Sequence, residues 1–533
     1  MKSRSNNTIF DSVPVHRPSV SSFDLSHNKI LSLDMGKLVP TLGLEVLPGD
    51  KFNINSENFL RLAPLVSPVM HQINVKTYTF FVPTRILWAE FPKWITKDST
   101  AEAPYITGLT VAGGWSTGSL ADYFDIPASS AGFTTQKISP MIFAAYLKCY
   151  DEYFRQQDLV TEKFEPLVAG DNSTNYLSVA TGQPVRKAWE HDYFTSCLPW
   201  AQKGDSVQLP LIDGTGTVQQ IPWGGIPQAY PHFTLADGTT STIIDGLAGN
   251  ANSVYKDSNS AQLSYNPAGT LQVDVNSDAV TINTLRRAFA VQKWLETNAR
   301  GGTRYTEHNL AHFGVKSSDS RLQRPEYLGS SAQTMRISEV MSTAQTVDQA
   351  SNDVPVGAYA GSGISIGASK GINYTAEEHG YIITMMCVLP KTSYYQGLHR
   401  MHQRFDPLDY ATPLLANIGE QEVYVKELRN DVGTSDDLNE VFGYIPRYSE
   451  YKFHHSGISG DMRGDATLPL DHFHMARTWT LDDLPALNEE FIEAKPDKRI
   501  FAVTDDTIHS IYAQVFHNIR AVRKLPKYGV PSL

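Results

Sequence analysis

The feature that most constrains the fold is the spacing of apolar residues near the C-terminus. Residues 508–522 alternate between an apolar face and a polar, aromatic face. The apolar face comprises Ile511, Ala513, Val515, Ile519 and Ala521, and the other face comprises Ser510, Tyr512, Gln514, Phe516, Asn518 and Arg520. Because successive side chains of a strand point to opposite sides of a sheet, this pattern predicts a β-strand with one buried face.

Two further segments predict strands that are buried more completely. Residues 73–81 (INVKTYTFF) are largely β-branched or aromatic with a period near two, and Val82 and Pro83 end the run. Residues 380–389 (GYIITMMCVL) form a continuous apolar run that stops at Pro390. A short apolar run of this kind is typical of a strand that is covered on both faces.

Helical patterns are fewer and indicate insertions. Ser139 and Pro140 predict the N-cap and first position of a helix over 141–157, and Thr284 precedes a second helix over 285–300. Strands without regularly intervening helices favour antiparallel sheets. The sequence therefore predicts a mainly β chain, folded as an antiparallel sandwich or barrel with long loop and helical insertions.

Composition excludes several other classes of protein. The chain has 533 residues, of which 41% are hydrophobic and 19% charged, so it is neither disordered nor collagen-like. Its three cysteines are too few to staple a chain of this size, which favours a reducing compartment. The longest apolar stretch, 381–389, is far shorter than the roughly 20 residues of a membrane helix. We therefore expect neither membrane insertion nor a secretory signal.

Residues 203–280 differ in composition from the rest of the chain. This segment contains no Arg, Glu, Met or Cys, and it has seven Asp against two Lys. Five aromatic residues in it are candidate contact anchors at the surface: Trp223, Tyr230, Phe233, Tyr255 and Tyr265. A structureless connection of this length is improbable within a compact domain. We predict a surface module inserted between two parts of the core, residues 1–202 and 281–533.

Catalytic patterns are short and lack context. Residues 114–118 and 363–367 match G-x-S-x-G, in which a serine occupies a sharp turn between a strand and a helix. Neither segment has that context, and chains rich in Gly and Ser produce such matches by chance. The sequence also contains no Walker phosphate loop, Rossmann glycine pattern or zinc-ligand spacing. We therefore expect a structural or binding protein with no cofactor, and no enzyme.

Histidines occur in three close pairs: His399/His402, His454/His455 and His472/His474. Adjacent imidazoles beside a carboxylate can hold a transition metal. An H-x-H pair in a jelly roll also begins the metal site of cupin enzymes, so a cupin-like metalloenzyme is one alternative function. The glutamate ligand of a cupin would fall at Thr478 or Trp479, and neither binds metal in that way. Local hydrogen bonding is the simpler role for these histidines, and a soluble carbohydrate-binding β-sandwich is the other alternative.

Basic residues concentrate at both ends of the chain. They are Lys2, Arg4 and Arg17 near the start, and Arg520, Arg523, Lys524 and Lys527 near the end. Such residues can neutralise phosphates, and Tyr512, Phe516 and Tyr528 nearby can stack on unpaired bases. A solvated strand end is the competing interpretation.

Several longer motifs are spread between residues 45 and 447. They are 45–50 (EVLPGD), 60–64 (LRLAP), 312–316 (HFGVK), 321–329 (RLQRPEYLG), 396–400 (QGLHR), 415–421 (LANIGEQ) and 442–447 (FGYIPR). Together they resemble the major capsid protein of the microviruses, the small icosahedral single-stranded DNA phages, and within them the gokushovirus-like branch. The resemblance covers most of the chain outside 203–280.

The resemblance implies a viral jelly roll in which eight antiparallel strands form two sheets. It also implies a T=1 icosahedral shell of 60 copies that encloses a circular single-stranded DNA genome. In such a shell the 203–280 module forms a protrusion at each three-fold axis, where it is a candidate for attachment to a host surface receptor. The expected location is the virion, and the host cytoplasm during assembly.

The resemblance further implies partners besides other copies of the chain. These are single-stranded DNA, a small basic DNA-binding protein, an internal scaffolding protein during assembly and a minor DNA pilot protein. The net charge of −11 has the same sign as the genome, so other cations have to neutralise most of the DNA. Contacts between subunits are expected in an aromatic segment, with Tyr444, Tyr448, Tyr451 and Phe453 as candidates.

Overall fold

The computed structural model divides the chain into two compact units. One unit comprises Met1–Ala201 and Asn298–Leu533, and the other comprises Gln202–Thr297. The structure describes residues 20–108, 118–126, 136–205, 207, 282–315, 323–341, 359–430, 438–464, 466–467, 469–480 and 484–528, together with four short strands at 233–235, 247–250, 253–256 and 263–265. The module predicted at 203–280 falls within the second unit, which extends further to include most of the following helix.

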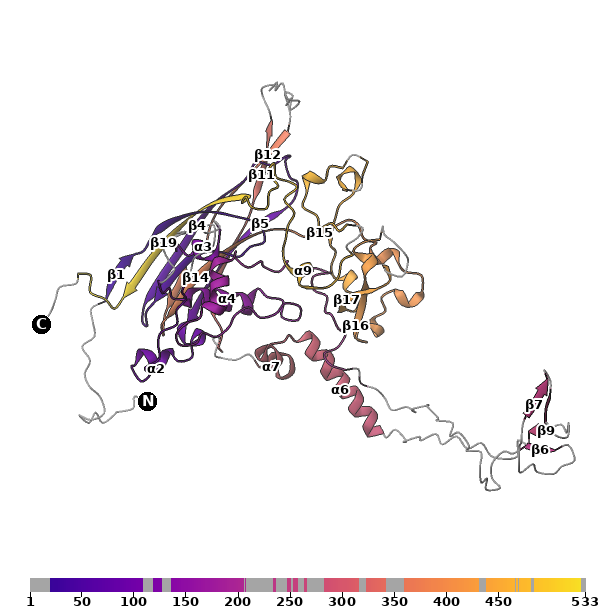
Figure 1. The fold of residues 1–533 in the computed structure, drawn as a ribbon. Helices are drawn as coiled ribbons and strands as arrows, with labels where there is room; N and C mark the ends of the chain where they lie inside the picture. Colours follow the sequence, from indigo (N-terminus) through magenta and orange to yellow (C-terminus); the bar gives the residue numbers. More distant parts are fainter. Residues whose placement is uncertain are drawn as a thin grey trace. The chain divides into compact units, whose positions relative to one another are not determined.

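The first unit contains a seven-stranded antiparallel sheet (Figure 1). Its strands are β1 (Ser21–Asp24), β2 (His27–Leu33), β4 (Lys51–Leu62), β11 (Arg336–Met341), β12 (Tyr359–Ala368), β13 (Ile372–Thr375) and β19 (Ile511–Arg523). The central path runs β1-β19-β4-β12-β11, with β2 also paired to β19 and β13 to β4. The last strand of the chain therefore lies between early strands, as in a Greek-key arrangement.

A second antiparallel sheet has four strands. They are β3 (Val39–Val46), β5 (Ile73–Pro83), β10 (Glu326–Thr334) and β14 (Gly380–Pro390), in the order β10-β5-β14-β3. The two sheets pack face to face, because buried side chains of β4 and β19 share two apolar clusters with those of β3, β5 and β14. The predicted mainly β, antiparallel architecture is confirmed as a sandwich, although its two sheets have seven and four strands.

Strand β14 is buried on both faces, as its apolar run predicts. Ile382 and Val388 point into the sandwich, whereas Ile383 and Met385 join a separate cluster on the other side of the sheet. That cluster includes many side chains of helix α4 (Met141–Tyr153), which lies against the four-stranded sheet (Figure 1). The four-stranded sheet is therefore the middle layer between a sheet and a helical cover.

The remaining elements are short, except helix α6. The helices are α1 (Thr84–Leu87), α2 (Phe91–Ile95), α3 (Leu120–Tyr123), α5 (Ser173–Thr181), α6 (Ile282–Arg300), α7 (Tyr305–Phe313) and α9 (Glu489–Ile492). Strands β16 (Glu420–Tyr424) and β17 (Val441–Pro446) form a hairpin over a satellite apolar cluster, and β15 (Ser393–Tyr394) pairs with β18 (Ser456–Gly457). In the part of the chain that the structure describes, no helix is long and apolar enough to cross a membrane.

Both predicted helices exist with shifted ends. Pro140, and not Ser139, occupies the N-cap of α4 and makes no side-chain cap hydrogen bond. The helix ends at Tyr153, because the C-cap residue Phe154 leaves the helical conformation at φ −124°. Helix α6 begins two residues before Thr284, at Ile282.

All three cysteines are buried free thiols. Cys149 and Cys387 lie in the cluster between α4 and the sheet, and Cys197 lies in the satellite cluster. Burial raises the pKa of each thiol, that of Cys387 to about 12. The thiols therefore act as small apolar side chains.

His517 is a buried polar link between the two sheets. It projects from β19, its Nδ1 lies 2.8 Å from Oγ of Ser56 on β4, and its Nε2 lies 3.1 Å from the carbonyl oxygen of Thr41 on β3. A carbonyl only accepts, so Nε2 carries the proton and the neutral ring accepts from the serine hydroxyl at Nδ1. Burial, with the nearby His27 and Lys29, lowers the pKa of His517 to about 4.

We expect this histidine to make the subunit sensitive to acid. Its pKa is lower in the folded chain than the ordinary 6.5, so the stabilisation is complete above pH 6.5 and is lost as the pH falls towards 4. The loss amounts to at most about 3 kcal/mol, at 1.36 kcal/mol per pKa unit. Urea unfolding between pH 7 and pH 4.5 measures it, and His517→Gln should flatten this dependence.

The matched control is His191→Gln, because His191 is exposed. This variant should keep the pH dependence of the wild-type chain. An unchanged pH dependence in His517→Gln would contradict the assignment of the proton uptake to the link between the sheets.

Candidate assembly and nucleic-acid surfaces

The outer face of the seven-stranded sheet is polar and aromatic. On β19, Tyr512 and Arg520 are exposed, and Phe516 is partly exposed, while the alternate residues point into the sandwich. Their cross-strand neighbours on β4 are Arg61 beside Tyr512 and Asn53 beside Arg520. This face therefore presents cations, amides and rings, which can contact single-stranded nucleic acid, together with the carboxylates of Asp24 and Glu57 and two exposed isoleucines.

The predicted basic residues of the C-terminal end differ in their surroundings. Arg520, Lys524 and Lys527 are exposed. Arg523 instead forms an ion pair of 3.0 Å with the buried carboxylate of Asp50 and donates to the carbonyl of Glu45. Because its charge is already matched within the chain, Arg523 is a packing residue and a poor phosphate ligand. Lys2, Arg4 and Arg17 lie outside the described residues.

Sequence reasoning missed the contribution of β4 to this face. The guanidinium of Arg61 lies 5.4 Å from the ring centre of Phe59, and Asn53 donates to Asn373 of β13 at 2.7 Å. The signal was present, because residues 51–62 alternate buried and more exposed positions along the whole strand. The pairing of β4 with β19 was needed to show that the outward residues of both strands lie on one face.

The second unit contains four short described strands. Strand β6 (Phe233–Leu235) pairs with β9 (Leu263–Tyr265), and β7 (Leu247–Asn250) pairs with β8 (Ser253–Lys256). In register, Phe233 faces Tyr265 across one ladder, and Tyr255 lies on the other. Trp223 and Tyr230 fall outside the described residues. Their role in host contact, like that of the three placed aromatic residues, stays a prediction.

The four predicted interface residues differ in how exposed they are. Tyr451 and Phe453 are exposed, and Tyr444 on β17 is partly buried. Tyr448 is buried within the chain, where its backbone adopts the left-handed conformation at φ 62° and its N–H donates to Gln421. The Tyr448 ring therefore offers little area to another subunit, whereas Tyr451 and Phe453 remain available.

Two of the histidine pairs meet in space. The ring centre of His399 lies 5.2 Å from that of His454 and 5.3 Å from that of His455. Burial and the neighbouring imidazoles lower the pKa of His455 to about 4 and also lower that of His399. Among the described residues, no group of three His, Cys, Asp or Glu side chains is arranged to hold a metal ion.

One member of the third histidine pair, His474, is held by local contacts. His474 is buried, its Nε2 lies 2.6 Å from the carbonyl oxygen of Met462, and its Nδ1 accepts the N–H of Ala476 at 3.1 Å. The guanidinium of Arg499 also lies 3.2 Å from Nδ1. The nitrogens of His474 are therefore engaged by the fold, as the hydrogen-bonding interpretation predicts.

The G-x-S-x-G match at 363–367 is part of a strand. Ser365 lies inside β12, is buried, and is 3.4 Å from the carbonyl of Thr334. A nucleophile on an elbow needs a turn that exposes its hydroxyl, and a buried position within a strand provides none. Of the other match, 114–118, only Gly118 is described.

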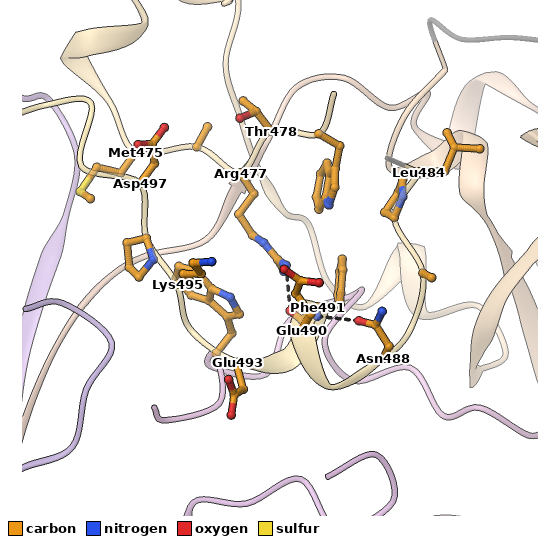
Figure 2. A pocket seen from close by; sticks show the side chains of 16 residues that line it. Met475, Arg477, Thr478, Leu484, Asn488, Glu490, Phe491, Glu493, Lys495 and Asp497 are labelled. Atoms are coloured by element: carbon orange, nitrogen blue, oxygen red, sulfur yellow. Dashed lines mark hydrogen bonds between the residues drawn. The ribbon is translucent and has the colours of Figure 1, made fainter. Parts of the chain in front are cut away.

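A cavity of about 270 Å³ lies beside the satellite cluster and is lined by residues 475–479, among others. Figure 2 shows the Arg477 side chain extending inside it towards Phe491. The Arg477 guanidinium lies 4.0 Å from the Phe491 ring centre and donates to the Phe491 carbonyl at 2.8 Å, and the rings of Trp479 and Phe491 are stacked. These contacts are typical of an arginine that packs against aromatic rings.

Comparisons with known proteins agree with this picture. The family model described as capsid protein (F protein) matches residues 11–533. A capsid protein VP1 of Bdellovibrio phage phiMH2K is 34% identical, and the match covers 99% of this chain and 98% of the relative. Capsid protein VP1 of Chlamydia phage 1 is 32% identical over 98% of this chain and 97% of the relative, and that of Spiroplasma virus 4 is 31% identical over 96% and 95%.

These matches run along nearly the whole length of each relative. The chain therefore belongs to the capsid protein (F protein) family of the microviruses and is a structural capsid protein, not an enzyme.

Proposed function

We propose that the sandwich is a viral jelly roll and that 60 copies of the chain form a T=1 shell around a circular single-stranded DNA genome. The observation that carries this proposal is the strand order. The paths β2-β19-β4-β12 and β3-β14-β5-β10 are two four-stranded antiparallel sheets, and β1, β11 and β13 extend the first. Two such sheets with the last strand beside an early one are the pattern of a jelly roll.

This architecture suits a shell subunit for a mechanical reason. Close-packed layers have low compressibility, so the sandwich transmits load as a rigid slab. The β16–β17 hairpin and the apolar cluster beneath it form what we call the satellite lobe. Loops and this lobe then meet neighbouring copies, since closed symmetric assemblies require matched surface patches on each copy. Expressed protein should therefore sediment as particles, and electron microscopy should show icosahedra. A chain that stays monomeric under all assembly conditions would contradict the proposed self-assembly into a 60-copy shell.

Charge supports a further part of the proposal. Sixty copies at −11 carry about −660, the sign of the genome, so bulk attraction between shell and DNA is absent. We propose that a small basic DNA-binding protein and counterions neutralise most phosphates. In this proposal the exposed face of β19 and β4, with Arg520, Lys524 and Lys527, is a local DNA-contacting surface. A scaffolding protein during assembly in the host cytoplasm and a minor pilot protein complete the proposed partners.

The DNA-contacting surface can be tested on purified subunits. The triple change Arg520→Gln, Lys524→Gln and Lys527→Gln should weaken binding to an oligothymidine strand. It should also reduce the slope of log K against log salt by about 2, at roughly 0.7 per phosphate contact on single strands. Fluorescence anisotropy over a salt series measures both.

The control for this test is Lys93→Gln with Lys97→Gln, because both lysines are exposed at helix α2, away from the sheet face. Unchanged affinity and slope in the triple variant, or an equal loss in the control, would exclude a specific contribution from the C-terminal cations.

We propose that the 203–280 module forms the three-fold protrusion and contacts a host receptor. Within the described residues its four strands pair only with one another, which supports a module that the core does not need. Replacing 203–280 by a short Gly/Ser linker should leave assembling particles with the main thermal transition retained and with poor adsorption to host cells. Insoluble protein would show that the core depends on the module.

A further inference from the structure

An exposed apolar surface lies on one segment of the first unit, residues 401–418. Six of its side chains are between 54 and 91% exposed: Met401, Phe405, Leu408, Tyr410, Leu414 and Ile418. The segment contains three short 3₁₀ turns, η1 (Arg400–His402), η2 (Pro407–Asp409) and η3 (Pro413–Leu415), and precedes the β16–β17 hairpin. We refer to these six side chains as the 401–418 patch.

Two buried ion pairs fix the base of the segment that carries the 401–418 patch. Arg400 lies 3.2 Å from the buried carboxylate of Glu427, and Arg404 lies 3.3 Å from Glu450. Arg404 also places its guanidinium 4.3 Å from the ring centre of Tyr451 and hydrogen-bonds to that tyrosine's hydroxyl. Both arginines are therefore held against the satellite lobe.

The turn that carries Phe405 is closed by side-chain caps. The Asp406 carboxylate accepts the N–H of Leu408 at 3.0 Å, and the Asp409 carboxylate accepts the N–H groups of Phe405 and Asp406, each at 2.9 Å. A surface whose backbone is fixed in this way loses little conformational entropy when a partner binds. The turn that carries Phe405 is thus held in place by hydrogen bonds while its apolar side chain is exposed.

The area is large for a protein that stays alone. The six side chains together expose on the order of 700 Å² along one segment of 18 residues, and the largest contiguous patch of a typical monomer is about 300–600 Å². The value is close to the roughly 800 Å² that each partner buries in a standard interface. The exposed ring of Tyr451 adjoins this segment, because the Arg404 guanidinium lies over both Tyr410 and Tyr451.

The chemistry of the patch selects the class of partner. Nucleic acid requires free cations, but Arg400 and Arg404 are both paired with buried carboxylates. A large apolar centre with aromatic rings and charges held at its base is instead the anatomy of a protein–protein interface. A capsid protein binds other copies of itself, so the partner present in every particle is a second copy.

We propose that the 401–418 patch is a contact surface between neighbouring copies of this chain, an inference that rests on the proposed shell function. The patch is buried in the assembled particle and exposed in the free subunit. Phe405 and Leu414, its two most exposed members, lie at the centre of the contact. The motif at 396–400 directly precedes this segment, and the motif at 415–421 overlaps its end and contains Ile418.

Replacing the central side chains tests this proposal. The double change Phe405→Ser and Leu414→Ser should shift the protein in sedimentation velocity from particles to free subunits. Because both side chains are exposed in the subunit, its thermal unfolding should match that of the wild-type chain. Particles formed by the double variant at the wild-type concentration would overturn the proposal.

The control is Met70→Ser in the loop between β4 and β5, because Met70 is 78% exposed and lies outside both the 401–418 patch and the proposed DNA-contacting face. This control should assemble as the wild type does. Equal loss of assembly in the control would overturn the assignment to the 401–418 patch, since the effect would then follow from any lost apolar side chain. A wild-type chain that never forms particles would refute the shell function itself.

Thiol labelling gives a second, independent readout. The three natural cysteines are buried, so Leu414→Cys introduces an accessible thiol. Maleimide should modify it in free or dissociated subunits and react at least roughly 10-fold more slowly in particles, because interface centres exclude water. Equal rates in particles and subunits would place the patch on a free surface and overturn the proposal. Self-association of subunits that protects the thiol would support it even without closed particles.

Discussion

The four-stranded sheet has to be covered on both of its faces, and this requirement organises the rest of the chain. Strand β14 is apolar at nearly every position, so neither of its faces can meet water without a large loss of hydrophobic stabilisation. The larger sheet covers one face, and α4 with its neighbouring loops covers the other. Of the two sheets of the sandwich, the seven-stranded one has an outward face among the described residues, and on β19 the polar and aromatic residues alternate away from the core.

The polar links follow from the same constraint. His517 crosses the sandwich as a neutral ring because its two nitrogens find one acceptor and one donor on different strands. The satellite lobe contains a buried charged group whose partners are also in place. The buried carboxylate of Glu427 accepts a hydrogen bond from Tyr193 and pairs with Arg400. Such groups are retained only where every partner is in place, and they give each layer a defined position.

Local pattern was sufficient for the strands that have strong periodicity. The runs at 73–81, 380–389 and 508–522 became β5, β14 and β19 with the expected burial. Strand β12 was not foreseen, because its Gly- and Ser-rich sequence has weak strand propensity and is recruited by pairing with β4. The end of α4 was also missed, because the helical pattern of the sequence continues past Phe154, where the backbone leaves the helix.

Site residues were harder to foresee, since their roles depend on residues distant in sequence. Arg523 is basic and close to the C-terminus, yet it forms an ion pair with Asp50. Tyr448 belongs to an aromatic segment, yet its ring faces inward. The 401–418 patch escaped notice because apolar residues in turns have no periodicity, so only their exposure in the folded chain distinguishes them from core residues.

The buried cysteines have a consequence for the durability of a particle. Oxidants and alkylating agents attack the thiolate, and a thiol that stays protonated at neutral pH and lacks contact with water is a poor target. A shell built from this chain can leave a reducing cell for an aerated medium without new covalent bonds inside its walls. The stability of the shell would then depend on non-covalent contacts alone, both inside the cell and after the particle leaves it.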